Sequence, residues 1–165
     1  SQDCTNMNGT QARKVCGMQD NAGKNNNLEM VGAPSQAKAI ILNDGTIVGF
    51  RLYEANCAMV FGDLKNVCGK LYVDLNGQKR PNSGGYDQFD IYVAKDKLVP
   101  SGFKGDYLTF EKACNRKIDT PYPGYSDQSM YSCAAWVLYN ENQDYLHCDD
   151  LSWTGKHSCK EKSNK

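Results

Sequence analysis

The chain has 165 residues, and its 19 acidic and 19 basic side chains cancel to a net charge of zero. This length suits a single domain. The charge balance argues against a nucleic-acid-binding protein, which would carry a basic patch or stripe. Apolar residues make up 40% of the chain, and glycine and asparagine are frequent, so we expect a modest core with long surface loops.

The N-terminal third predicts an irregular segment followed by a β-hairpin. Residues 1–36 are polar and rich in asparagine, which is typical of irregular structure. Two apolar runs, residues 37–42 and 46–53, then flank Asp44-Gly45, a dipeptide typical of hairpin turns. We treat residues 37–159 as the core of one globular domain that spans residues 1–165.

Alternation in the second run predicts which side chains of that strand are buried. Val48, Phe50 and Leu52 are the larger apolar residues of the run, and we expect them to face the core. The segment that follows is a short connection, and we expect three of its apolar residues to cover the core: Met59, Val60 and Phe61.

The most informative stretch is residues 68–93. Alternating apolar runs at residues 71–73 and 89–93 indicate two strands, and a loop of Asp, Asn, Gly and Pro residues joins them. Glycine supplies the positive φ angles that such a loop needs, and Asx side chains supply local hydrogen bonds. The loop is longer than a tight hairpin turn requires.

The second half predicts long connections and one short helix. Residues 95–105 indicate a chain reversal, and residues 106–132 indicate a long surface connection. Apolar residues at helical spacing after Asp127, a residue type suited to an N-cap, predict a helix over residues 127–140. A strand over residues 135–139 is the alternative.

Eight cysteines are spread along the chain. An even number in a loop-rich sequence indicates disulfides and an oxidising compartment. Sequence alone does not fix their pairing, but each neighbouring pair brackets a segment rich in turn-forming residues, which favours pairing between neighbours. The four predicted pairs are Cys4–Cys16, Cys57–Cys68, Cys114–Cys133 and Cys148–Cys159.

A zinc site is the competing interpretation of the last two cysteines. His147 is adjacent to Cys148, and His157 lies two residues before Cys159; these residue types bind zinc. The spacing differs from the usual patterns of zinc ligands, and adjacent His and Cys make an awkward chelate. We therefore favour exposed histidines beside a disulfide.

The loop within residues 68–93 resembles one found in the head domains of bacterial type IV pilin-like proteins, the pseudopilins. In that group a pattern close to V-D-x-N-G-x-x-x-P-N-x-x-G-x-D-x-F precedes a strand. The hairpin over residues 42–50 and the segment 133–153 also resemble parts of those heads. The residues that match the loop pattern are Val73, Asp74, Asn76, Gly77, Pro81, Asn82, Gly85, Asp87 and Phe89.

The resemblance implies an α+β fold, in which an N-terminal helix packs on an antiparallel sheet of about four strands. It also implies a structural role, as a minor pilin or pseudopilin of a type IV pilus or a type II secretion filament. The protein would lie in the bacterial cell envelope, in the periplasm or at the cell surface. No cofactor is needed for that role.

Subunits of this group begin with an apolar helix of about 20 residues, which serves as membrane anchor and filament core. This chain begins with a polar segment, and we expect that the anchor helix was removed from it. Contacts with other pilin or pseudopilin subunits would run through that helix. We therefore expect the isolated head to be a monomer.

The loop between the two central strands is a candidate calcium site. Its candidate oxygen ligands are Asp74, Asn76, Asn82 and Asp87. The run Asp74-x-Asn76-Gly77 resembles the start of an EF-type loop. The glutamate that completes an EF-type loop is missing, although the resemblance implies calcium in some pseudopilin heads. The alternative is an Asx-rich turn whose side chains cap backbone N–H groups.

Aromatic residues suggest an alternative function, namely a secreted carbohydrate- or surface-binding module. Such a module would use a stacking surface formed by the aromatic loop region. The candidate residues are Tyr107, Tyr122, Tyr125, Tyr131 and Trp136.

Catalytic signatures are absent from the sequence. It contains no G-x-S-x-G, no H-E-x-x-H and no glycine-rich phosphate loop. Cys114, with Asn115 and Arg116 beside it, would be a nucleophile only if it were unpaired. We therefore expect no enzymatic activity and name no catalytic residue.

Overall fold

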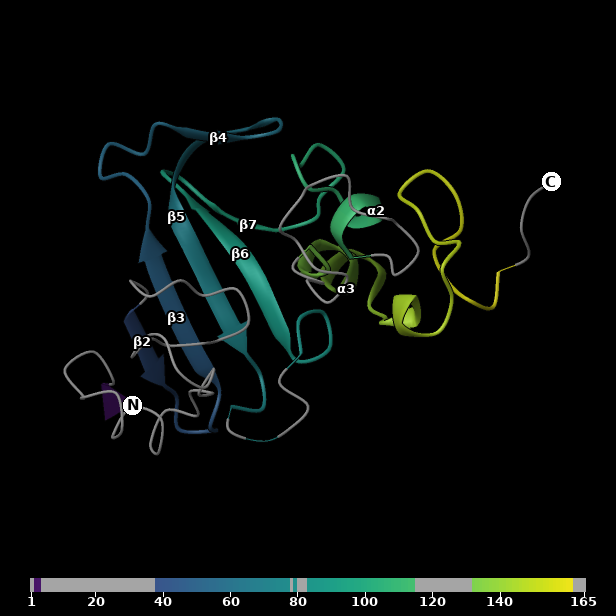
Figure 1. The fold of residues 1–165 in the computed structure, drawn as a ribbon, viewed down its shortest axis with the longest axis horizontal. Coiled ribbons are helices and arrows are strands. Elements are labelled where there is room, and N and C mark those ends of the chain that lie inside the picture. Colours follow the sequence, from purple (N-terminus) through teal and green to yellow (C-terminus); the bar gives the residue numbers. More distant parts are fainter. Residues whose placement is uncertain (1, 4–37, 78, 80–82, 115–131, 162–165) are drawn as a thin grey trace, which may run out of the picture.

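The computed structural model describes residues 2–3, 38–77, 79, 83–114 and 132–161. Within them the chain forms a seven-stranded sheet with the order β1-β2-β3-β5-β6-β7, and β4 pairs with β5 outside this path (Figure 1). All of its strand pairs are antiparallel. The strands are β1 (Gln2–Asp3), β2 (Lys38–Ile41), β3 (Ile47–Leu52), β4 (Met59–Phe61), β5 (Leu64–Asp74), β6 (Gln88–Ala94) and β7 (Leu98–Pro100).

The antiparallel sheet is confirmed, but it is larger than predicted. Two of the extra strands, β4 and β7, lie in segments that we had interpreted as connections. β5 also begins at Leu64 rather than near residue 71. The predicted irregular segment, residues 1–36, lies outside the described residues apart from β1.

The predicted hairpin joins β2 to β3. Gly45 has a φ of 93°, a value that a side chain with a Cβ rarely adopts, so glycine is needed at this position. The side chain of Asp44 accepts a hydrogen bond of 2.9 Å from the backbone N–H of Thr46. The turn is therefore held by the Asp-Gly chemistry that the sequence indicated.

The two faces of the sheet differ in composition. Residues that pair directly across strands share a face, so the register assigns the following positions to the two faces. One face, called here the charged face, carries Ala39, Ile41, Ile47, Gly49, Arg51, Lys70, Tyr72, Asp74, Gln88, Asp90, Tyr92 and Val99. The other, called the apolar face, carries Ile40, Val48, Phe50, Leu52, Leu71, Val73, Phe89, Ile91, Val93, Leu98 and Pro100.

The face of β3 that is buried is the opposite of the one we predicted. Ile47 and Gly49, on the charged face, are buried. Val48 and Phe50 are half-buried, and Leu52 is 51% exposed. The prediction was wrong because alternation shows which residues share a face, whereas the covering of that face depends on distant parts of the chain.

The segment between Cys57 and Cys68 also differs from its prediction. Met59 and Phe61 pack against a buried cluster around Tyr92, as expected for residues that cover the core. Val60 is 56% exposed, so it does not. The difference follows from β4, because successive side chains of a strand point to opposite sides.

Short helices gather beside the β6–β7 side of the sheet (Figure 1). They are α2 (Phe110–Ala113), α3 (Ala134–Asn140) and the 3-10 turn η1 (Asp144–Leu146). The helical prediction is confirmed over α3, which excludes the alternative strand at that position. The helix begins at Ala134, later than predicted, and the proposed N-cap Asp127 lies outside the described residues.

Three of the four predicted disulfides are formed: Cys57–Cys68, Cys114–Cys133 and Cys148–Cys159. Cys4 and Cys16 lie outside the described residues. Disulfides persist in oxidising compartments, so the protein belongs in an extracellular or periplasmic setting. Among the helices that the structure describes, none combines the length and the apolar character needed to cross a bilayer.

Candidate functional site

The candidate calcium loop follows β5, whose last residue is Asp74. Asp74 is only 2% exposed. Its Oδ1 atom accepts hydrogen bonds from the backbone N–H groups of Gly77 (2.8 Å) and Asn76 (3.3 Å). Its Oδ2 atom accepts one of 2.8 Å from the side-chain amide of Gln88. Asp74 therefore caps its own loop, as in the Asx-turn alternative.

Asp87 closes the other end of this loop. Its Oδ1 atom accepts a hydrogen bond of 2.7 Å from the backbone N–H of Ser83. Burial, together with the nearby charge of Asp87, raises the pKa of Asp74 above its ordinary value, although hydrogen bonds from Gln88 and Gly77 oppose this. Asn82, the remaining candidate ligand, lies outside the described residues. Among the described residues, no group of three or more His, Cys, Asp or Glu side chains could hold a metal ion.

Asp74→Ala should lower the free energy of unfolding by about 3 kcal/mol, because it leaves buried donors without an acceptor. Urea denaturation measures this, and Asp44→Ala, which removes a cap from an exposed turn, should have a much smaller effect. The same variant tests the calcium alternative. If the loop is a calcium site, millimolar calcium raises the melting temperature of the wild type and leaves that of Asp74→Ala unchanged. No change in the wild type would favour the Asx turn. An equal stability loss in both variants would contradict the structural role.

The cysteines of the zinc alternative are paired with each other. Cys148 and Cys159 form a disulfide, so neither sulfur is a thiolate that could bind a metal. His147 and His157 are both exposed. The bond confirms the interpretation that we favoured.

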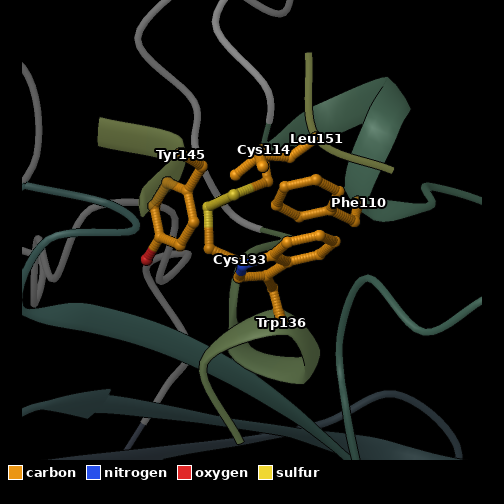
Figure 2. Packing of buried hydrophobic residues seen from close by; sticks show 6 residues of the cluster. All are labelled: Phe110, Cys114, Cys133, Trp136, Tyr145 and Leu151. Carbon is orange, nitrogen blue, oxygen red and sulfur yellow. A yellow bond between two sulfur atoms is a disulfide. The ribbon is translucent and has the colours of Figure 1, made fainter. Parts of the chain in front are cut away.

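Trp136, one of the five candidates for the predicted aromatic surface, belongs to the core instead. Its side chain is 0% exposed, and its ring stacks on that of Phe110 with 3.9 Å between centroids (Figure 2). Tyr107 is 50% exposed. The sequence suggested a surface because tryptophan is common both at interfaces and in cores. The other three candidates, Tyr122, Tyr125 and Tyr131, lie outside the described residues.

Sequence reasoning missed an exposed apolar pair on α3. Leu138 and Tyr139 are 62% and 68% exposed. The ring of Tyr139 meets the partly buried ring of Trp153 edge-on, with centroids 6.0 Å apart. The helical spacing that buries Trp136 could have revealed Leu138, because a position two residues later falls on another side of the helix.

A buried polar cluster lies on the charged face. Lys70 on β5 and Asp90 on β6 form an ion pair of 2.9 Å, and their side chains are 15% and 6% exposed. The hydroxyl of Tyr92 donates a hydrogen bond of 3.1 Å to Oδ1 of Asp106. The backbone N–H of Gly102 donates one of 2.7 Å to Oδ2 of the same residue. Burial raises the pKa of both Asp90 and Asp106.

On the apolar face, every apolar side chain named above is at least partly exposed. Ile40, Leu52 and Leu98 are exposed, and the other apolar residues of this face are half-buried. At the edge nearest the helices, Phe89 packs against the cluster around Trp136. A continuous apolar surface of this extent on a sheet is typical of a binding surface for another element or another protein.

Comparison of the chain with protein-family models, with curated proteins and with solved structures gives no match. The functional argument therefore depends on the geometry of these surfaces.

Proposed function

We propose that this chain is the head domain of a pilin-like subunit, a minor pilin or pseudopilin of a type IV pilus or type II secretion filament. It would be held in the bacterial cell envelope by an apolar N-terminal helix. The observation that carries the proposal is the apolar face of the sheet, with no fully buried apolar side chain. The order of the three sequence segments and the oxidising compartment support it.

The apolar face suits a helix. Helices and sheets bury their apolar sides against each other, and this pairing is among the standard layer arrangements of domains. The middle of the face is formed by Phe50, Leu71 and Ile91, which are direct neighbours on β3, β5 and β6. We propose that the anchor helix packs along this row. The chain would then have the α+β arrangement of a pilin.

The proposal leaves the loop that follows β5 with a structural role. Asp74 and Asp87 hold the connection between the two longest strands of the sheet through backbone hydrogen bonds. In a filament, this loop would present a fixed shape on the head. No cofactor and no enzymatic activity is proposed.

To test this proposal, the protein is expressed with its natural N-terminal segment, and its assembly into a filament is measured. We expect wild-type protein in the membrane fraction, cross-linkable to other filament subunits. Leu71→Lys and Ile91→Lys should abolish this association, because each places a charge under the helix. Leu138→Lys, on an exposed position of α3, is the matched control and should assemble normally.

Contrary outcomes point elsewhere. A protein released in soluble form after removal of a signal peptide would contradict the pilin proposal. Binding to glycans that Tyr139→Ala abolishes would favour the carbohydrate-binding alternative, which the exposed Tyr139 supports.

The isolated head is proposed to be a monomer at micromolar concentration, and light scattering measures this. A stable dimer burying well over ~1,000 Å² would imply a different assembly.

A further inference from the structure

Lys70 and Asp90 are held in contact by the register of the sheet. Lys70 lies opposite Tyr92, and Asp90 lies opposite Tyr72, so the two residues are diagonal neighbours on the charged face. Nζ of Lys70 donates a hydrogen bond of 2.9 Å to Oδ2 of Asp90. Because the backbone pairing of β5 and β6 fixes both residues, an amine and a carboxyl group are presented to each other with little freedom.

Burial makes this pair chemically unusual. The two side chains are only 15% and 6% exposed, and separated charges are costly in such surroundings. Burial lowers the pKa of Lys70, but the charge of Asp90 and its hydrogen bond to Lys70, with other nearby groups, outweigh burial and raise that pKa, so the ion pair is the resting form. Transfer of a proton from the ammonium to the carboxylate gives a neutral amine and a neutral acid, and burial lowers the cost of this transfer. The neutral amine is the nucleophilic form of lysine. The neutral acid is more readily attacked at carbon than a carboxylate.

The surroundings supply a second carboxyl group, that of Asp106. Nζ of Lys70 lies over the ring of Tyr92, 4.9 Å from its centroid. The hydroxyl of the same tyrosine donates a hydrogen bond to the buried carboxyl group of Asp106. Asp106 is near enough for its charge to act on both Lys70 and Asp90. A second carboxyl group in this position can take up and return a proton during a reaction between the pair.

We propose that Lys70 and Asp90 react to form an isopeptide bond, a covalent amide that cross-links β5 to β6. Nζ of neutral Lys70 attacks Cγ of protonated Asp90, and the C–N bond forms. The bond from Cγ to the hydroxyl oxygen then breaks, and the hydroxyl leaves with an amine proton as water, with Asp106 as the proton relay. The step is a condensation and needs no oxidant, reductant or other co-reactant.

The amide would make the sheet resistant to unfolding under load. It replaces a buried ion pair with an uncharged group, which removes the cost of keeping two charges away from water. It also closes a covalent ring around the loop between the two strands, which restricts the unfolded chain as a disulfide does. Unlike a disulfide, this cross-link would survive reduction. It is independent of the filament role proposed above.

The experiment is mass spectrometry of the purified, fully reduced wild-type protein. We expect an intact mass lower than the sequence requires by one water, and a branched peptide that joins the segments containing Lys70 and Asp90. The branched peptide is needed because a succinimide at Asp44-Gly45 would also lose one water. Lys70→Arg keeps the cation but cannot form this amide, so it should show the full mass.

Wild-type protein that keeps its full mass after long incubation in the folded state would overturn the proposal. A water loss that persists in Lys70→Arg would overturn it as well, because the loss would then arise elsewhere. Asp106→Asn tests the proton relay. The folded variant should form the cross-link more slowly than the wild type, and an unchanged rate would remove Asp106 from the reaction.

Discussion

Replacing Trp136 with alanine should lower the free energy of unfolding by about 3–5 kcal/mol, the range observed for large buried side chains. The side chain is fully buried in the cluster formed with Phe110, Cys114, Cys133, Tyr145 and Leu151 (Figure 2). Its removal would leave a cavity beside the Cys114–Cys133 disulfide. That disulfide restricts how far the surrounding residues can collapse into the space.

Polar contacts add to this expected loss. Nε1 of Trp136 donates a hydrogen bond of 3.0 Å to Oδ1 of Asn142, and the variant would leave that acceptor without this donor. Tyr139→Ala is the matched control, since it removes a large aromatic ring from the same helix at a position that is 68% exposed. Chemical denaturation followed by circular dichroism measures both. Equal losses in the two variants would contradict the assignment of Trp136 to the core.

The local parts of this fold were predictable from the sequence. The β2–β3 hairpin follows from Asp44-Gly45, because one residue with positive φ and one Asx side chain determine the turn. The described disulfides join neighbouring cysteines for a similar reason, since the segments between them turn back on themselves. In each case the determining residues lie close together in the chain.

The covering of the sheet was not predictable in this way. Val48, Phe50 and Leu52 form the more apolar side of β3, and an apolar side is usually the buried one. In this protein the buried side instead carries charged residues that pair with one another. Lys70 and Asp90 are twenty positions apart, and their contact depends on the register between two strands. Sequence patterns do not determine such pairing when both strands alternate equally well.

The candidate sites show the same distinction. The sequence identified the loop at Asp74 as unusual, because a cluster of Asx residues and glycines is typical of a turn held by side-chain hydrogen bonds. The sequence did not show that both carboxylate oxygens of Asp74 accept hydrogen bonds. One of these bonds comes from Gln88 on the neighbouring strand, and that contact depends on the strand register. A charged residue between apolar neighbours, as at Asp90, is the signal that could have indicated the buried cluster.

Lowering the pH from about 7 toward about 4 should increase the free energy of unfolding, the reverse of ordinary acid denaturation. Burial raises the pKa values of Asp74, Asp90 and Asp106 in the folded protein above the ordinary value of 3.8. Each group then binds its proton more tightly in the folded state than in the unfolded state. Stability is therefore gained as the pH falls through the folded pKa, and the gain is complete below 3.8.

Two other carboxyl groups act in the opposite direction, at lower pH. A hydrogen bond from the backbone of Thr46 lowers the pKa of Asp44, and one from the hydroxyl of Ser158 lowers that of Asp144. Their contributions are present above 3.8 and are lost as the pH falls through the folded pKa of each group. The three buried groups therefore raise stability as the pH falls, and Asp44 and Asp144 lower it at still lower pH.

Urea denaturation at a series of pH values measures this dependence. Each unit of pKa shift corresponds to about 1.4 kcal/mol between the two protonation states, so several buried groups give a readily measured slope. Asp74→Asn and Asp106→Asn should each flatten the rise, because each removes one group that takes up a proton on folding. If Lys70 and Asp90 are joined by an amide, Asp90 no longer titrates and the slope comes from the other two. A stability that falls steadily below pH 7 would contradict this prediction. It would show that these carboxyl groups stay ionised in the folded protein and that burial does not raise their pKa values.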